Sequence, residues 1–378
     1  MNWARDGVNE AARRASGSLL QRVLRVDAPL FGLLALLAGI GVIVLYSAFG
    51  NRIDPVQSHL LRLTAGLVLM LGLAQVPPWR LAPLAPWAYA GGLVLLAAVF
   101  IAGESGGGAR RWLDLGVFGF QPSELMKLAL PMMVAWMLSR APLPITFGRA
   151  IVALSLIAAP AAMIGLQPDL GTALLVAAAG LGVVFLAGIG WRIILALGAV
   201  VAAATPLLWV FGMQDYQRQR VLTFLDPERD PLGAGYNIIQ AQIAIGSGGI
   251  FGKGWLNGTQ AHLEFIPERH TDFVFAVLAE EFGLLGVIAV VTLYAAIIAR
   301  ALWIAREAQD NFSRLLAGGL ALTFFVYTFV NMGMVAGLLP VVGLPLPLIS
   351  YGGSSIVTLL AGFGILMSIH SHRRMWSA

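Results

Sequence analysis

Residues 267–283 read PERHTDFVFAVLAEEFG and run directly into the apolar stretch LLGVIAVVTLYAAIIA at 284–299. A transmembrane helix needs about 20 mostly apolar residues, and the chain from Asp272 onward supplies them. Such a helix would begin with a carboxylate and would carry two more, Glu280 and Glu281, where charge is costly. Ionisable residues in membrane helices usually face a cavity or a partner, so this segment predicts a membrane protein with a polar site.

The rest of the chain has the same apolar character. Of its 378 residues, 58% are hydrophobic and 11% are charged, a composition typical of integral membrane proteins. Continuous apolar runs favour helices over the alternating strands of a barrel. We expect an all-α, polytopic fold with about ten transmembrane helices, at 28–49, 59–76, 81–102, 124–139, 150–166, 169–189, 191–213, 272–299, 315–336 and 348–369.

The basic residues indicate the orientation of the chain. With both termini in the cytoplasm, most Arg and Lys in the short loops fall on the cytoplasmic side, as the positive-inside rule requires. This topology explains the net charge of +5 and gives no reason to expect nucleic acid as a partner. It divides the chain into a tail at 1–27, one transmembrane domain at 28–370 with an extracytoplasmic loop at 213–271 between helices 7 and 8, and a tail at 371–378.

Polar residues gather on the predicted outer face. They come from the loop at 103–116 with the helix start QPSELMK (121–127), from the corner QPDLGT (167–172), and from the long loop at 213–271. Loops longer than about 15 residues are usually functional or disordered. Apolar residues inside this loop argue against disorder, so we expect it to rest on the outer membrane interface or to dip into it.

Two of these segments carry charges with more than one interpretation. Glu124 and Lys127 lie three residues apart on one helix face and can neutralise each other. They are either a structural ion pair or functional groups that face a cavity. Asp169 follows Pro168 at the start of an apolar run, where a carboxylate can cap a helix. Capping and a role in the site both stay open for Asp169.

Asp272 is the candidate general base. Glu268, Arg269 and His270 precede it directly, and such neighbours can shift the pKa of a carboxylate and orient it. A simple helix cap is the alternative. We expect Glu280 to reach the same cavity, and Glu281 to pair with another helix.

A cationic set is predicted at the same membrane face. It consists of YQRQR (216–220) with Arg110, Arg111, Lys127, Lys253 and Arg269. Diphosphate is the anion that such a set fits, because Arg binds phosphate in a bidentate way and Lys supplies a point charge. A departing diphosphate also needs positive charge where its own charge develops. Pairing with the acids of DPERD (226–230) is the alternative.

Two glycine-rich segments remain. GSGGIFGKG (246–254) lacks the residues that a P-loop requires and is interpreted as a turn. GLLPVVGLPLPLISYGGSS (337–355) places proline and glycine at membrane depth, where non-helical backbone is tolerated only against protein or a cavity. It predicts either a broken or re-entrant segment beside the site or a simple loop before the last helix.

The chain has no cysteine, which excludes disulfides and thiolate chemistry.

These motifs together resemble a known family. The matching segments are GARRWLDLG, QPSELMKLALP, QPDLGTALLV, the run from YQRQR to FGKGW, GTQAHLEFIPERHTDFVFAVLAEEFGLLG and PVVGLPLPLISYGGSS. They cover essentially the whole chain and resemble the SEDS family (shape, elongation, division, sporulation), in particular its RodA branch. The division branch, FtsW, is less similar around YQRQR and GTQ.

The resemblance implies the SEDS fold and a peptidoglycan glycosyltransferase of the bacterial cell inner membrane, with its active site facing the periplasm. Such an enzyme polymerises lipid II into a growing lipid-linked glycan during cell elongation. The implied partners are a class B penicillin-binding protein that supplies the transpeptidase, other elongation-complex proteins and membrane lipids. The family's essential acid falls on Asp272, and the Trp of its ARRW loop falls on Trp112. Arg111, Glu124 and Lys127 occupy other polar positions of the family's cavity.

On this interpretation Asp272 accepts the proton of the acceptor GlcNAc 4-hydroxyl, which attacks C1 of an α-linked MurNAc with inversion, and undecaprenyl diphosphate leaves. The candidate substrate-binding residues are Arg111, Trp112, Glu124, Lys127, Asp169, Arg218, Arg220, Lys253, His270 and Ser350. Mg²⁺ or Mn²⁺ near Asp272 is chemically reasonable, but no ligand spacing demonstrates a metal site.

Two other functions fit a polytopic protein with intramembrane charges. A lipid II flippase or secondary transporter would also have broken helices, but it should expose polar groups along both halves of its path. The inner side of this chain offers few acids, which favours an outward-facing enzyme. A noncatalytic scaffold for a penicillin-binding protein would tolerate substitution of the cavity charges.

Overall fold

The computed structural model describes residues 25–106, 109–114, 119–213, 215–229, 234–263 and 265–372. These residues are mostly helical, which confirms the all-α prediction. The exception is a small antiparallel sheet in the order β1 (Glu104–Gly106), β2 (Ala109–Asp114) and β3 (Gly119–Phe120). Most of the two predicted tails, at 1–24 and 373–378, lies outside the described residues.

Each predicted apolar run coincides with one long helix. The long helices are α3 (Ala28–Ala48), α4 (Ile53–Gln75), α6 (Ala85–Ala102), α7 (Pro122–Ser139), α8 (Phe147–Leu166), α9 (Leu170–Leu186), α10 (Trp191–Leu207), α14 (Val274–Glu307), α15 (Asn311–Val335) and α16 (Ser354–Ser371). Within the described ranges, 7 helical segments are long and apolar enough to cross a membrane. The number of about ten spans stays a prediction.

Short helices complete the fold. They are α5 (Pro78–Leu81), η1 (Ala82–Leu84), η2 (Leu208–Gly212), α11 (Asp215–Leu225), η3 (Pro227–Arg229), α12 (Ala234–Ser247) and α13 (Thr259–His262). Most of them lie in the predicted loop at 213–271, which is therefore a set of helices rather than irregular chain.

Two helix starts differ from the sequence prediction by more than four residues. α4 begins at Ile53 instead of residue 59, because Asp54 and Pro55 both suit a first helical turn, which accepts carboxylates and does not need the proline N–H. α16 begins at Ser354 instead of residue 348. The apolar segment before it is buried but not helical, since Pro345 and Pro347 interrupt any helical hydrogen-bond ladder.

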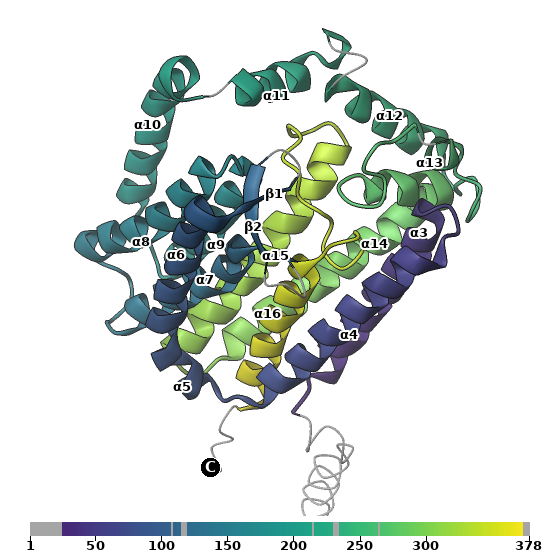
Figure 1. Ribbon diagram of the computed structural model, residues 1–378. Coiled ribbons are helices and arrows are strands. Elements are labelled where there is room, and N and C mark those ends of the chain that lie inside the picture. Colours follow the sequence, from purple (N-terminus) through teal and green to yellow (C-terminus); the bar gives the residue numbers. More distant parts are fainter. Residues whose placement is uncertain are drawn as a thin grey trace, which may run out of the picture.

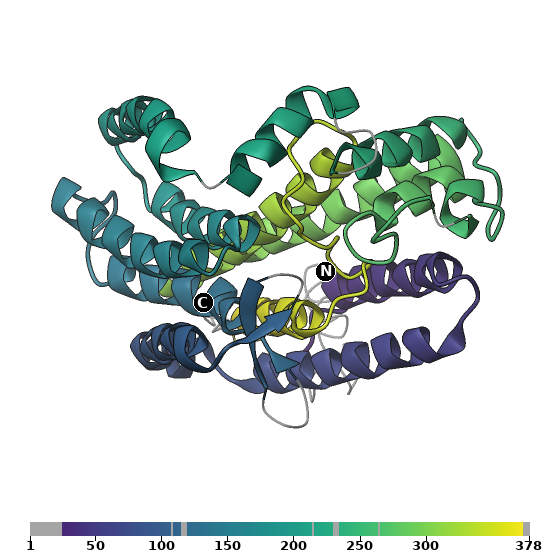
Figure 2. The same ribbon diagram turned by 45° about the horizontal axis from the view of Figure 1, so that its top comes forward.

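The helices form two groups around a central trio (Figure 1). α14, α15 and α16 run through the middle, α3 and α4 pack on one side, and α6 to α9 pack on the other. α11, α12 and α13 lie across one end of the molecule. Figure 2 shows the segment at 337–353 passing through the middle of the bundle.

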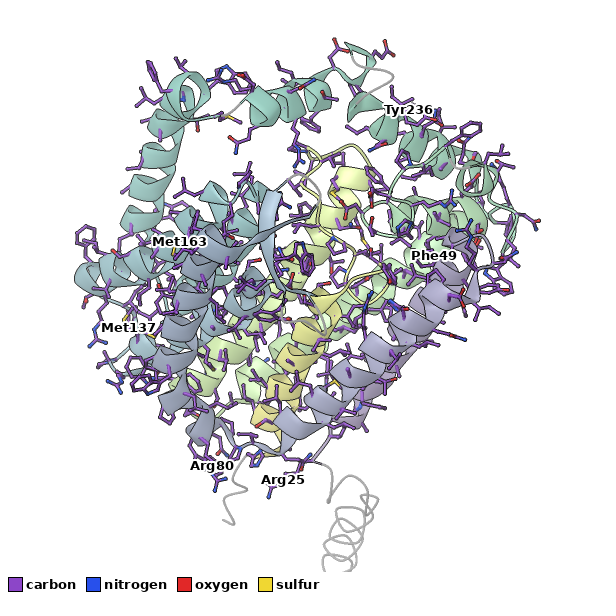
Figure 3. The ribbon with its side chains drawn as sticks, viewed as in Figure 1. Arg25, Phe49, Arg80, Met137, Met163 and Tyr236 are labelled. Atoms are coloured by element: carbon purple, nitrogen blue, oxygen red, sulfur yellow. The ribbon has the colours of Figure 1, made fainter. Side chains whose placement is uncertain are left out.

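The two ends of the bundle carry different residues. Arg25 and Arg80 lie at the end where the described chain stops near residue 372, whereas Tyr236 and Phe49 lie at the opposite end (Figure 3). The orientation in which the first end faces the cytoplasm stays a prediction.

Helix α14 is interrupted at Gly283, which has φ 62° and ψ −163°. The turn predicted at 246–254 is present and docks against this break. The N–H groups of Lys253 and Gly254 donate to the carbonyls of Glu280 and Glu281 at 3.0 Å each, and Leu284 N donates to Gly249 O at 2.9 Å. At the break, the carbonyls of Glu280 and Glu281 and the N–H of Leu284 form hydrogen bonds with the turn in place of helical hydrogen bonds. These backbone groups therefore stay paired.

We expect Gly283→Ala to lower the apparent melting temperature of the detergent-solubilised protein by several degrees. Its φ is unfavourable for a side chain, at a cost of about 1–3 kcal/mol, and its Cβ would collide with the backbone of Gly252 and Ile250. Gly39→Ala in α3 is the control, because nothing lies near its Cβ. Equal melting temperatures for the two variants would contradict the docking of the turn.

Candidate active site

A cavity of about 210 Å³ lies where the central helices meet the end that carries α11 to α13. It brings together β2, the starts of α7, α9 and α16, the turn before α14, and one position in the middle of α15. Its lining residues include Arg111, Trp112, Gln121, Glu124, Lys127, Asp169, Thr172, Thr271, Asp272, Tyr327, Gly343, Tyr351, Gly352, Gly353, Ser354 and Ser355.

Asp272 lies in the turn directly before α14, and the backbone of this turn is held from two sides. Asn331 Nδ2 of α15 donates to Asp272 O at 3.0 Å, and Ser350 Oγ donates to Thr271 O at 2.5 Å. Tyr351 N donates to His270 O at 2.8 Å. The N-cap position of α14 is Phe273, so Asp272 does not cap the helix. Among the described residues its carboxylate has no hydrogen bond or ion pair.

The electrostatic surroundings suit a base. Burial, the largest effect, and the negative charge of Glu268 raise the pKa of Asp272, the charge of Arg220 lowers it, and the net result is a pKa of about 6. A general base works best when its pKa lies close to the operating pH. Burial also lowers the pKa of His270, so its imidazole is neutral at pH 7. The result is an unpaired carboxylate that faces the cavity and can accept a proton near neutrality.

Glu124 and Lys127 form the ion pair that their spacing predicts. Lys127 Nζ lies 2.7 Å from Glu124 Oε1, and the two side chains are 5% and 6% exposed. Lys127 Nζ also lies 3.4 Å from Tyr327 Oη and over the Tyr327 ring. Both alternatives for this pair are thus compatible with the geometry, because it is a buried ion pair and it also lines the cavity.

Asp169 combines the two roles considered for it. Its Oδ1 accepts a hydrogen bond from Thr172 N at 3.2 Å, which confirms the cap on α9. Its Oδ2 accepts from Gln121 Nε2 at 3.2 Å and lies 3.7 Å from Arg111 Nη1. Arg111 Nη2 donates to Pro168 O at 2.5 Å. The carboxylate therefore positions Arg111 at the cavity wall, next to Trp112.

Other predicted binding residues lie outside the cavity lining. Arg218 donates to the carbonyls of Trp209 and Val210 at 2.9 and 2.8 Å, which ties α11 to η2. Arg220 Nη1 donates to Val341 O at 3.4 Å and acts on Asp272 through its charge. Ser350 and His270 hold the turn before α14 through the bonds described above, and their side chains do not line the cavity.

The expectation that Glu280 shares the cavity is wrong. Its side chain is 0% exposed, and Oε1 accepts from Lys253 Nζ at 2.7 Å, Thr259 Oγ1 at 3.0 Å and Gln260 N at 3.0 Å. Protein surrounds the first turns of α14, so this face meets the turn at 253–260 instead. Lys253 is consequently absent from the cavity as well. Glu281 accepts a hydrogen bond from Ser47 of α3, which confirms that it pairs with another helix.

Several cavity residues were missed by the sequence analysis. Gln121, Ser354 and Ser355 lie inside motifs that it quoted, so their polar character was a usable signal. Tyr327 of α15 lines the cavity, and Asn331 of the same helix holds the turn before α14. Their only signal in the sequence is that they are polar groups at membrane depth. Within the described ranges, no group of three His, Asp or Glu side chains is placed to hold a metal ion, so the geometry assigns no site for Mg²⁺ or Mn²⁺.

Comparison with known proteins decides the family. A family model for cell cycle proteins of the FtsW, RodA and SpoVE group matches residues 27–375. The chain belongs to this family. The peptidoglycan glycosyltransferase MrdB of Escherichia coli K12 is 55% identical over 345 residues, which are 91% of this chain and 93% of MrdB. The probable peptidoglycan glycosyltransferase FtsW of Geobacter metallireducens is 41% identical over 289 residues, 75% of this chain and 76% of that protein.

Solved structures of family members have the same fold. A chain from a study of a peptidoglycan synthase complex that coordinates polymerization and crosslinking aligns with a TM-score of 0.80 at 36% identity, covering 91% of this chain and 97% of that one. The rod shape determining protein RodA of Thermus thermophilus aligns with a TM-score of 0.71 at 32% identity, covering 93% and 98%. The resemblance seen in the sequence is thus confirmed, and the chain is an integral membrane protein.

We expect the Glu124 and Lys127 charges to be energetically coupled. Glu124→Gln or Lys127→Met alone leaves one uncompensated charge in a buried site, which costs about 3–5 kcal/mol. The double variant removes both charges and should be much less destabilised than the sum of the single variants. A double-mutant cycle on the unfolding free energy, measured by SDS titration, checks this. Additive costs would show that the two side chains do not interact.

Proposed function

We propose that this chain is a peptidoglycan glycosyltransferase that polymerises lipid II into β-1,4 glycan strands during cell elongation. The observation that carries the proposal is the unpaired Asp272 carboxylate, with a pKa of about 6, at the wall of the cavity. Similarity to a protein named peptidoglycan glycosyltransferase supports it across 91% of the chain.

The chemistry needs a base at the acceptor and positive charge at the leaving group. Asp272 takes the proton of the acceptor 4-hydroxyl while that oxygen forms a bond to C1 of the donor MurNAc. The bond from C1 to the diphosphate oxygen breaks on the opposite face, so the configuration at C1 inverts. Undecaprenyl diphosphate leaves with the electron pair. Trp112 at the cavity wall would stack on a sugar ring.

The location follows from the same proposal. The chain spans the bacterial cell inner membrane with both termini in the cytoplasm, and its cavity opens to the periplasm where lipid II is used. The basic residues at the end near residues 25 and 80 support this orientation.

The proposed partner is a class B penicillin-binding protein that supplies the transpeptidase. A similar solved chain belongs to a complex that couples polymerization to crosslinking, which supports a partner of this kind. Lipid II, the growing lipid-linked glycan, membrane lipids and other elongation-complex proteins complete the proposed set. A lipid II flippase and a noncatalytic scaffold are the competing functions that the next experiment separates.

We expect Asp272→Asn to abolish the synthesis of long glycan strands from purified lipid II. The assay uses the detergent-solubilised protein with its penicillin-binding partner, with folding and complex formation matched to the wild type. Asparagine is nearly isosteric and cannot accept the proton. Asp54→Asn, an exposed position on α4, is the control and should polymerise normally. Strands from the Asp272→Asn protein would remove Asp272 as base, and absence of strands from every protein, together with lipid II crossing vesicle membranes, would favour the flippase.

The rate should fall as the pH drops through about 6, because protonated Asp272 cannot act as a base. Arg220 lowers the pKa of Asp272 and Glu268 raises it. Arg220→Gln should therefore move the acid limb of the kcat/KM profile to higher pH, and Glu268→Gln should move it to lower pH. A profile that does not respond to either substitution would show that another group controls the acid limb.

A further inference from the structure

The cations predicted to bind the leaving diphosphate are already compensated. Lys127 is paired with Glu124 at 2.7 Å, and Arg111 lies beside Asp169 at 3.7 Å. Asp272 adds a third carboxylate to the same cavity. This part of the lining therefore has no excess of positive charge for a group that carries several negative charges.

Another part of the cavity lining has a different character. Gly352, Gly353, Ser354 and Ser355 all line it, and they form the start of α16, a helix of 18 residues. The first N–H groups of a helix have no partner within the helix, and no side chain caps α16. These groups and the helix dipole favour anions. Within the described chain the Ser354 and Ser355 hydroxyls donate no hydrogen bond, so they are free to donate to a ligand.

A second observation lies on the neighbouring helix α4. Arg62 lies about 14 Å along the axis from the start of α4, a helix that is long and apolar enough to cross a membrane. Its guanidinium carbon is 4.7 Å from the centroid of the Tyr351 ring. Among the described residues Arg62 has no carboxylate partner and no hydrogen bond. A charge at this depth is costly and usually faces a cavity or a ligand.

His59 lies one turn before Arg62 on the same face of α4. Its side chain is 0% exposed, its ring is stacked 6.1 Å from Tyr351, and neither ring nitrogen has a hydrogen-bond partner. Buried polar atoms are almost always satisfied, and leaving them unsatisfied is unfavourable. Both His59 nitrogens are therefore available to a polar ligand beside Tyr351, and this observation is independent of the helix terminus.

Tyr351 connects the two observations. It lines the cavity and immediately precedes the glycines at the start of α16, while its ring contacts Arg62 and His59. The same helix α4 exposes Leu60, Leu61, Val68 and Leu69. An apolar tail can thus stay in the bilayer against α4 while a charged group reaches Tyr351.

We propose that Arg62 and His59 of α4, Tyr351 and the N-terminus of α16 form a binding site for a phosphate or diphosphate carried on a lipid. This inference rests on the proposed function, in which that group is the diphosphate of the lipid-linked donor. Arg62 supplies charge, His59 and the Ser354 and Ser355 hydroxyls supply hydrogen bonds, and the helix dipole stabilises the negative charge that develops as the bond to C1 breaks. The phosphate of a membrane phospholipid has the same chemistry and is the other source.

The test measures binding of undecaprenyl diphosphate, and separately of phosphatidylglycerol, to the purified full-length protein in nanodiscs of neutral lipid. Arg62→Gln should weaken binding about tenfold or more, because it removes charged hydrogen bonds. Gly353→Asp should weaken it as strongly, since the carboxylate would occupy the free N–H groups. That variant should still fold and keep its melting temperature, because Asp is a favoured helix cap and nothing lies near the Gly353 Cβ.

One control matches these variants. Arg52→Gln removes an exposed arginine from the cap of α4, outside the proposed site, and should bind like the wild type. If Arg62→Gln and Gly353→Asp lose binding of undecaprenyl diphosphate alone, the site belongs to the lipid-linked donor. If they lose binding of phosphatidylglycerol alone, the site belongs to a phospholipid.

Unchanged binding in both Arg62→Gln and Gly353→Asp would overturn the site. Asp272→Asn separates this inference from the proposed function, because it should bind undecaprenyl diphosphate normally and fail only in polymerisation. One outcome is that the wild type binds undecaprenyl diphosphate without polymerising lipid II, while Arg62→Gln weakens that binding. In that case the proposed function is wrong and the site stands. If polymerisation is normal in the wild type and in both site variants, the function stands and the site is wrong.

Discussion

Backbone polar groups at membrane depth must find their partners inside the protein, and the segment at 337–353 meets this constraint at the centre of the bundle. Asn331 Nδ2 donates to Leu344 O at 2.6 Å as well as to Asp272 O. Ser350 Oγ accepts from Leu346 N at 2.6 Å and donates to Thr271 O. The bonds that satisfy this non-helical segment are therefore the bonds that fix the turn carrying Asp272. Catalytic geometry and the folding of a proline-rich segment depend on the same contacts.

The break in α14 also frees backbone groups that must find partners inside the protein. Gly283 releases the carbonyls of Glu280 and Glu281, and the turn at 248–254 pairs with them. The two buried carboxylates next to the break are occupied by structural partners, Lys253 and Ser47. Of Asp272, Glu280 and Glu281, only Asp272 has an unpaired carboxylate at the cavity. It is therefore available for the proposed role of base, while the other two hold the fold.

The elements around the cavity differ in the charge that they supply. β2, α7 and α9 bring cations together with their own carboxylates, so their wall is close to neutral. The start of α16 lines the cavity and brings positive potential without a carboxylate, and Arg62 of α4 adds to it through its contact with the lining residue Tyr351. A lipid-linked sugar that enters this cavity would meet the base on one side and the excess of positive potential on another, as an inverting displacement requires.

The sequence by itself determined the membrane class, the positions of the long helices, the family, and Asp272 as the candidate base. These follow from hydropathy, from the positive-inside rule and from contiguous motifs, all of which are local properties of the chain. It also indicated the Glu124–Lys127 pair, because a spacing of three residues within one helix specifies a contact. Only the tertiary structure decided that Glu280 faces Lys253 and that Tyr351 meets Arg62 and His59. Those contacts join residues far apart in the chain, and the rotation of one helix against another is set by packing and by backbone satisfaction rather than by any local pattern.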